Sequence, residues 1–164
     1  MIDIKEKITK AHPYLERANS LFDQARYDKA LAEISKATAL APEVWLYHFA
    51  EGNILLKMGR LEDARKAALN ALKLKAADSD SWLLLGVIEK ALGNFRASAK
   101  AYSKSAELHE DPSVLTMLAS VQATFDLGAA KQSAQRAVEL DPDWDEAYKA
   151  LKEINRRITE GQPT

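Results

Sequence analysis

Small and large apolar residues recur along the chain at a fixed interval of 34 positions, and helical spacing fills each interval. Three series of equivalent positions show the interval: Ala30, Ala64 and Ser98; Ala37, Ala71 and Ser105; and Leu40, Leu74 and Leu108. Within the first interval, small or apolar side chains stand at positions 31, 34, 37 and 38, the spacing of one helix face. This periodicity predicts an all-α solenoid in which each helix pair stacks on the next.

Each interval is predicted to hold two antiparallel helices joined by a tight turn. The turn falls at Ala25, Gly59 and Gly93, because a left-handed backbone costs glycine nothing. A large apolar residue, predicted to fill the hinge, follows two positions later: Tyr27, Leu61 and Phe95. Small residues at positions 18, 52 and 86 are predicted to face those at 30, 64 and 98, which lets the two helices approach closely.

The pattern divides the chain into four helix pairs within residues 13–142, at approximately 11–44, 45–78, 79–111 and 112–142. Prolines or capping side chains stand at the junctions: Pro42, Asp78 to Ser81, Pro112 and Pro142. The fourth pair is shortened, since Ala130 follows Ser98 by only 32 positions.

The two ends of the chain differ from the repeats. Residues 1–12 are predicted to be an extension or a short cap, because His12 and Pro13 should interrupt any helix through Ile4 and Ile8. Residues 143–159 predict a C-terminal capping helix that seals the last pair, and residues 160–164 a disordered tail. The sealing stripe of this helix is Trp144, Ala147, Tyr148, Leu151, Ile154 and Ile158.

Composition and charge narrow the function. The net charge is −1, the two signs are interspersed and no basic block exists, so we expect no nucleic-acid partner. The longest apolar runs are far shorter than the roughly 20 residues of a membrane helix, so no membrane association is expected and the cytoplasm is the default location. The absence of cysteine excludes disulfides and thiolate chemistry.

The repeats resemble the tetratricopeptide repeat family over roughly residues 11 to 158. The third interval carries the signature most fully: Trp82, Leu85 and Gly86, followed by Gly93, Phe95, Tyr102 and Leu108. Tyr14 and His48 stand where the family has tryptophan. The resemblance implies a right-handed superhelix whose concave groove, lined by the first helix of each pair, holds an extended peptide or a partner helix.

The family's groove positions give the candidate binding residues of this chain: Leu15, Asn19, Phe22, Leu46, Phe49, Asn53, Leu83 and Val87. Asn19 and Asn53 are equivalent residues, and their amides could pair with a peptide backbone as two rungs of a ladder or could be solvated surface groups. The apolar members could form a hydrophobic binding patch or serve only to pack helices. Leu15 and Phe49 occupy the position where a carboxylate clamp needs lysine, which argues against acidic C-terminal tails as ligands.

No pattern of catalytic or metal-binding residues was found. His12, His48 and His109 are isolated, so we expect no metal, no cofactor and no enzymatic activity. The leading hypothesis is a monomeric adaptor that binds a protein or peptide partner in its groove. The alternatives are a solenoid that self-assembles through an end or the groove, and an export chaperone that holds an apolar segment of its partner.

Overall fold

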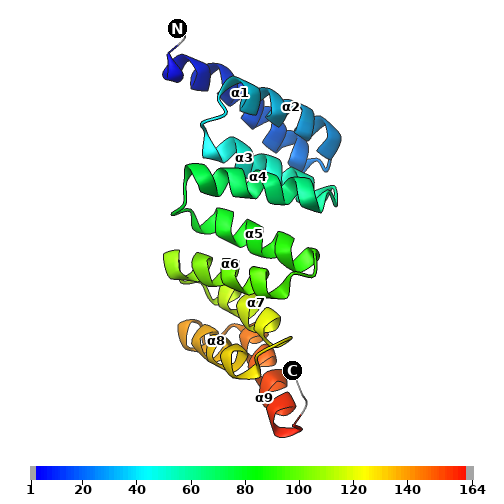
Figure 1. Ribbon diagram of the computed structural model, residues 1–164, viewed down its shortest axis with the longest axis vertical. Helices are drawn as coiled ribbons and strands as arrows, with labels where there is room; N and C mark the ends of the chain where they lie inside the picture. The colour runs from blue at the N-terminus through cyan, green and yellow to red at the C-terminus, as the bar shows by residue number, and fades with distance from the viewer. Residues whose placement is uncertain (1–2, 162–164) are drawn as a thin grey trace. The chain divides into compact units, whose positions relative to one another are not determined.

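The computed structural model describes residues 3–161, which form nine α-helices and no β-strand (Figure 1). The helices are α1 (Ile4–Asp23), α2 (Tyr27–Leu40), α3 (Trp45–Lys57), α4 (Leu61–Leu74), α5 (Ser79–Ala91), α6 (Phe95–Leu108), α7 (Pro112–Gln122), α8 (Leu127–Leu140) and α9 (Asp145–Thr159). The predicted all-α solenoid of helix pairs is confirmed. Residues 1–2 of the predicted N-terminal extension and 162–164 of the predicted tail lie outside the described residues.

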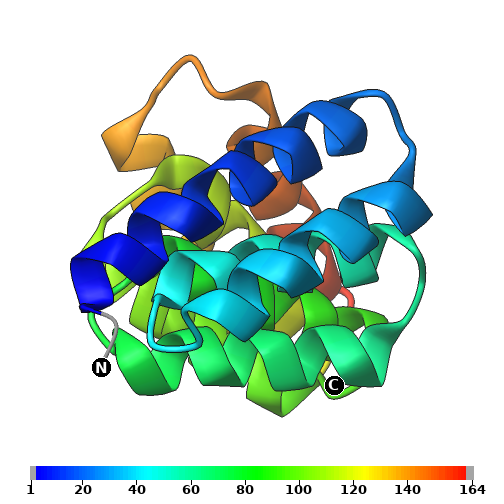
Figure 2. The ribbon, with the colours of Figure 1, turned by 90° about the horizontal axis from the view of Figure 1, so that it is seen from above.

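The chain divides into two compact units, residues 1–84 and 85–164. In the first unit α1 packs antiparallel on α2, α2 packs on α3, and α3 packs on α4 (Figure 2). α1 also contacts α3 directly, so these two helices lie on the same side of the unit. The second unit contains the C-terminal half of α5 and repeats the arrangement in α6, α7 and α8, with α9 packed on both α7 and α8.

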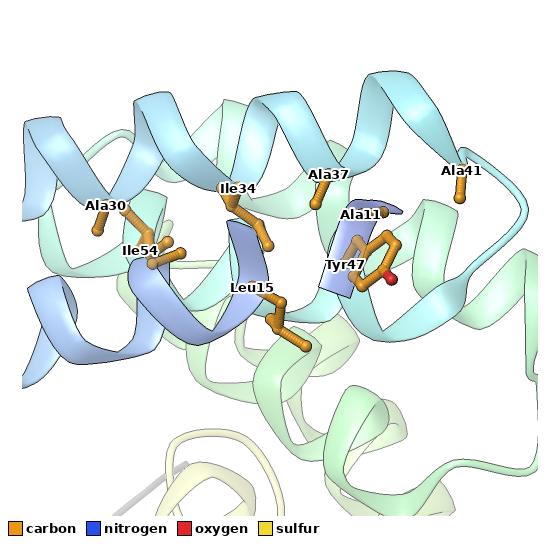
Figure 3. Packing of buried hydrophobic residues seen from close by; sticks show 9 residues of the cluster. Ala11, Leu15, Ala30, Ile34, Ala37, Ala41, Tyr47 and Ile54 are labelled. Atoms are coloured by element: carbon orange, nitrogen blue, oxygen red, sulfur yellow. The ribbon is translucent and has the colours of Figure 1, made fainter. Parts of the chain in front are cut away.

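The core of the first unit is built from the small and apolar series found in the sequence. Its side chains extend from α1, α2 and α3 toward one another (Figure 3). The members are Ala11, Leu15, Ala18, Ala30, Ile34, Ala37, Ala41, Tyr47 and Ile54, each at most 5% exposed. Five alanines among them let the helix backbones approach closely, and Ile34, Tyr47 and Ile54 fill the remaining volume.

The turns within the pairs adopt the predicted left-handed backbone. The φ angles are 57° at Ala25, 73° at Gly59 and 80° at Gly93. The prediction for the residues that follow is wrong in one case: Tyr27 and Leu61 are half-buried, but Phe95 is 41% exposed. Tyr27 meets Phe22 edge-on at 5.5 Å between ring centroids, which closes the first hinge.

Helix α1 does not break at Pro13, contrary to the prediction. It runs unbroken from Ile4 to Asp23 with the proline in its interior. An internal proline costs about 3 kcal/mol through its lost hydrogen bond and steric clash. Buried contacts on both sides of the proline offset this cost, since Ala11 and Ala18 are completely buried in the core.

Aspartates fix three helix starts. Asp78 accepts hydrogen bonds from the backbone N and the hydroxyl of Ser81, at 3.0 and 2.7 Å, as predicted from the sequence. Asp111 caps α7 and Asp126 caps α8, where its Oδ1 accepts from the backbone N of Ala129 at 2.9 Å. Asp78 and Asp111 therefore mark the first helices of the third and fourth pairs, and Asp126 marks the second helix of the fourth pair.

The C-terminal helix buries less than its predicted stripe. Ala147 is completely buried and Ile154 is 3% exposed, whereas Tyr148 is 48% and Ile158 43% exposed. The buried line faces α7 and α8, while the other two side chains lie beside it on the helix surface. The predicted seal therefore consists of the inner part of the stripe alone.

Candidate functional site

Six of the eight predicted binding residues line one pocket between α1 and α3. The pocket has a volume of about 240 Å³ and is lined by Leu15, Asn19, Phe22, Leu46, Phe49, Ala50, Asn53 and Ile54. It exists because α1 and α3 are the first helices of successive pairs and contact each other along one side of the first unit. All eight lining residues are uncharged.

Burial separates the floor of this pocket from its rim. Leu15 and Ile54 are 5% and 2% exposed, so they are fixed by the core beneath the pocket. Phe22 and Phe49 are half-buried, and Leu46 is 37% exposed. The exposed parts of these three side chains supply an apolar surface on which a ligand could be desolvated. Leu15 was predicted to be a binding residue, but it packs in the core and exposes little surface that a ligand could contact.

The two asparagines share this pocket but differ in their freedom. Asn53 is half-buried, and its Nδ2 donates to the carbonyl of Phe49 in the preceding turn at 3.1 Å. Its Oδ1 and one N–H remain available for a ligand. Asn19 is exposed, and no hydrogen bond of its side chain is found within residues 3–161. The two amides thus offer complementary donors and acceptors from two neighbouring helices.

The other two predicted residues lie outside this pocket. Leu83 belongs to the first unit and Val87 to the second, and both are half-buried. Conversely, the pocket is also lined by Ala50 and Ile54, which were not among the residues predicted from the sequence. Both lie next to predicted positions on α3, and a helical wheel drawn through Leu46, Phe49 and Asn53 would have included them.

An aromatic and cationic cluster borders the start of α3. The Trp45 ring lies 6.2 Å from that of Phe49, and the Lys75 ammonium stands 3.9 Å from the centre of the Trp45 ring. Lys75 also donates to Asp78 at 2.9 Å. Trp45 therefore packs against its neighbours.

The histidines do not form a metal centre. His48 is 92% buried, and the described part of the chain holds no group of three or more histidine, cysteine, aspartate or glutamate side chains that could bind a metal ion. Within residues 3–161, the one acidic partner of His12 is Glu16, at 3.6 Å. None of the described helices is both long enough and apolar enough to cross a membrane.

The family model described as "Tetratricopeptide repeat" matches residues 15–81 and 49–114. No curated protein sequence matches this chain. Solved structures are similar to it at low sequence identity. A MamA protein matches with a TM-score of 0.83 and 14% identity, over 92% of this chain and 82% of its own.

Two further structures were solved as peptide-binding proteins. YrrB, described as "a TPR protein with an unusual peptide-binding site", matches with a TM-score of 0.80 and 20% identity, over 98% of this chain and 86% of its own. The first TPR domain of Spaghetti (RPAP3), bound to the HSP90 peptide SRMEEVD, has a TM-score of 0.58 and 18% identity, over 93% of this chain and 95% of its own. At these identities the likeness concerns the fold.

Proposed function

The chain belongs to the tetratricopeptide repeat family, and from this premise we propose that it is a non-enzymatic scaffold that binds a peptide segment of a partner protein. The binding site is the pocket between α1 and α3. The observation that carries the proposal is the convergence of exposed apolar surface and two asparagine amides on this one uncharged pocket.

The chemistry of the pocket selects the ligand. Phe22, Leu46 and Phe49 favour one apolar side chain of the peptide, and about 240 Å³ accommodates a side chain of the size of leucine or methionine. Asn19 and Asn53 can pair with the peptide backbone on either side of it. An acidic ligand is disfavoured, since no cation lines the pocket to neutralise it.

The test is a selection of phage-displayed random dodecapeptides on the whole chain, followed by fluorescence anisotropy with the selected peptides. The double variant Asn19→Ala, Asn53→Ala should bind them roughly 10- to 30-fold more weakly, because each amide hydrogen bond contributes about 1 kcal/mol. The melting temperature should stay the same, since neither side chain belongs to the core.

A charge introduced at Phe49 provides the second arm of the test. Phe49→Asp should abolish binding, because it places an unpaired carboxylate in the apolar part of the pocket. The matched control is Leu69→Asp on α4, where the leucine is 45% exposed and does not line the pocket. This site would be refuted if the selected peptides bound Phe49→Asp and the double asparagine variant with the same affinity as the native chain.

Self-association through an end is the second candidate function. Ile4 and Ile8 on the first turns of α1 are 51% and 37% exposed, and they continue the apolar stripe that is buried from Ala11 onward. Light scattering during size-exclusion chromatography distinguishes the two functions. A scaffold stays monomeric at micromolar concentration, whereas a self-assembling solenoid grows in mass with concentration and loses this growth in Ile4→Lys, Ile8→Lys.

A further inference from the structure

A second pocket lies on the other side of α3 and has a different chemical character. It has a volume of about 510 Å³, twice that of the peptide pocket, and its lining comes from α2, α3 and α4 with Arg60 of the turn between α3 and α4. Phe49 of the first pocket and Glu51 of the second are about 200° apart around the α3 axis, so the two pockets open on opposite faces of the first unit.

His48 brings an unsatisfied acceptor into this second pocket. Its Nε2 lies 2.8 Å from the carbonyl oxygen of Pro42, and because a carbonyl can only accept, the imidazole proton resides on Nε2. Nδ1 then carries a lone pair. It is fully buried and has no hydrogen-bond partner within the described residues. Such a group is costly unless something donates to it.

Glu51 places a second acceptor beside the first. Its Oε2 lies 3.9 Å from His48 Nδ1, too far for a hydrogen bond between them. Burial raises the pKa of Glu51 despite the nearby positive charges of Arg60 and Lys66, so the ionised carboxylate is poorly solvated. Because the separation of the two acceptors is shorter than twice a hydrogen-bond length of about 2.9 Å, one donor nitrogen can bridge both once the pocket opens to the buried Nδ1.

The remaining lining residues restrict what can enter. Leu31, Leu55 and Ala67 supply apolar wall, and Leu55 and Ala67 are each 4% exposed. Arg60 is already engaged by Asp63, with its Nε 2.9 Å from Oδ2. The lining also includes Lys66 and the polar side chains of Ser35, Thr38 and Asn70, so the two acceptors lie in a pocket of mixed apolar and polar character.

We propose that this pocket binds a primary alkylammonium group, which donates hydrogen bonds to His48 Nδ1 and Glu51 Oε2 while its alkyl stem lies against Leu31, Leu55 and Ala67. The source is either a free alkylamine or a lysine side chain of another protein. The site is separate from the peptide pocket, and the proposal does not depend on the proposed function.

The experiment is an NMR titration of the whole ¹⁵N-labelled chain with n-butylammonium at pH 7.5. Backbone amides of the pocket lining should shift saturably, while those of Asn19 and Phe49 stay in place. Butyltrimethylammonium keeps the charge but has no N–H, and 1-butanol keeps a hydroxyl donor but has no charge. Each should bind at least tenfold more weakly than n-butylammonium, because charge-assisted hydrogen bonds carry the affinity.

A matched pair of variants isolates the carboxylate. Glu51→Gln should weaken n-butylammonium at least tenfold without loss of stability, since it removes a poorly solvated charge. Glu62→Gln makes the same chemical change at an exposed position on α4 outside the pocket and should bind like the native chain. The ¹⁵N resonance of His48 Nδ1 in the native chain gives an independent readout, because it should move when a donor arrives.

A second arm identifies the source of the ammonium. Nα-acetyl-lysine amide that binds at least as tightly as n-butylammonium assigns the site to a lysine side chain, and exclusion of this probe assigns it to a free amine. The proposal is overturned by an absence of saturable shifts in the pocket lining, by equal binding of butyltrimethylammonium, by a Glu51→Gln variant with native affinity, or by an unmoved His48 Nδ1 resonance.

Discussion

Gly52 and Gly86 occupy equivalent repeat positions, yet alanine should be tolerated at only one of them. A Cβ built at Gly86 would lie 2.4 and 2.5 Å from Cδ1 and Cε1 of the Tyr102 ring, which is 1% exposed and has no room to move. At Gly52 the nearest atom is Cδ2 of Leu84 at 3.0 Å, the flexible end of a side chain. The two substitutions therefore add the same methyl group to very different surroundings.

The magnitudes follow from two opposing effects. Replacing glycine by alanine inside a helix stabilises it by up to about 1 kcal/mol. Overpacking a filled core costs about 1–3 kcal/mol. We expect Gly86→Ala to lower the free energy of unfolding by about 1–2 kcal/mol and Gly52→Ala to leave it unchanged or raise it by up to about 1 kcal/mol.

The assay is urea unfolding followed by far-UV circular dichroism at 25 °C, with the denaturation midpoints compared at constant slope. Tyr102→Leu removes the ring that causes the clash, so Gly86→Ala should cost at least about 1 kcal/mol less in that background. Tyr102→Phe keeps the ring and should give no such relief. Equal stabilities of the two alanine variants, or no coupling between positions 86 and 102, would refute the packing argument.

Three further substitutions test the local backbone and the helix cap. Ala25→Gly should raise the melting temperature slightly and Gly59→Ala should lower it, because the φ angles of 57° and 73° at these positions are unfavourable for alanine. The left-handed backbone costs alanine about 1–2 kcal/mol, and the greater freedom of glycine in the unfolded chain offsets part of this difference. Thermal melts in which Ala25→Gly is destabilising and Gly59→Ala is stabilising would contradict the turn assignment. Asp78→Ala should cost about 1–2 kcal/mol at pH 7 through the lost cap. Burial raises the pKa of Asp78, but hydrogen bonds from Ser81 and Lys75 outweigh this effect and hold the pKa below its ordinary value. The stabilisation by the cap is therefore complete above about pH 4 and disappears as the pH falls through the lowered pKa. In unfolding measurements from pH 7 to pH 2, the stabilities of the native chain and the variant should converge in acid, and a constant difference between them would exclude the cap as the cause.

The pocket between α1 and α3 was largely predictable because it follows the repeat. Asn19 and Asn53 are one interval apart, and equivalent positions of successive first helices lie on the same side of the stack. The lining of the second pocket was not predictable in this way. His48 and Glu51 are three residues apart on α3, but the unpaired Nδ1 arises only from the contact between Nε2 and the carbonyl of Pro42, which precedes the helix.

The sequence by itself determined the helices, their pairing and their turns, because these depend on local periodicity and on which residues tolerate a left-handed backbone at positions 25, 59 and 93. Tertiary packing decided the rest. It carries α1 through Pro13, leaves Phe95 exposed where Tyr27 is half-buried, and leaves less room for a Cβ at Gly86 than at Gly52. The physical reason is that equivalent positions share a local conformation but have different neighbours, and burial, clashes and unpaired polar atoms are properties of the neighbours.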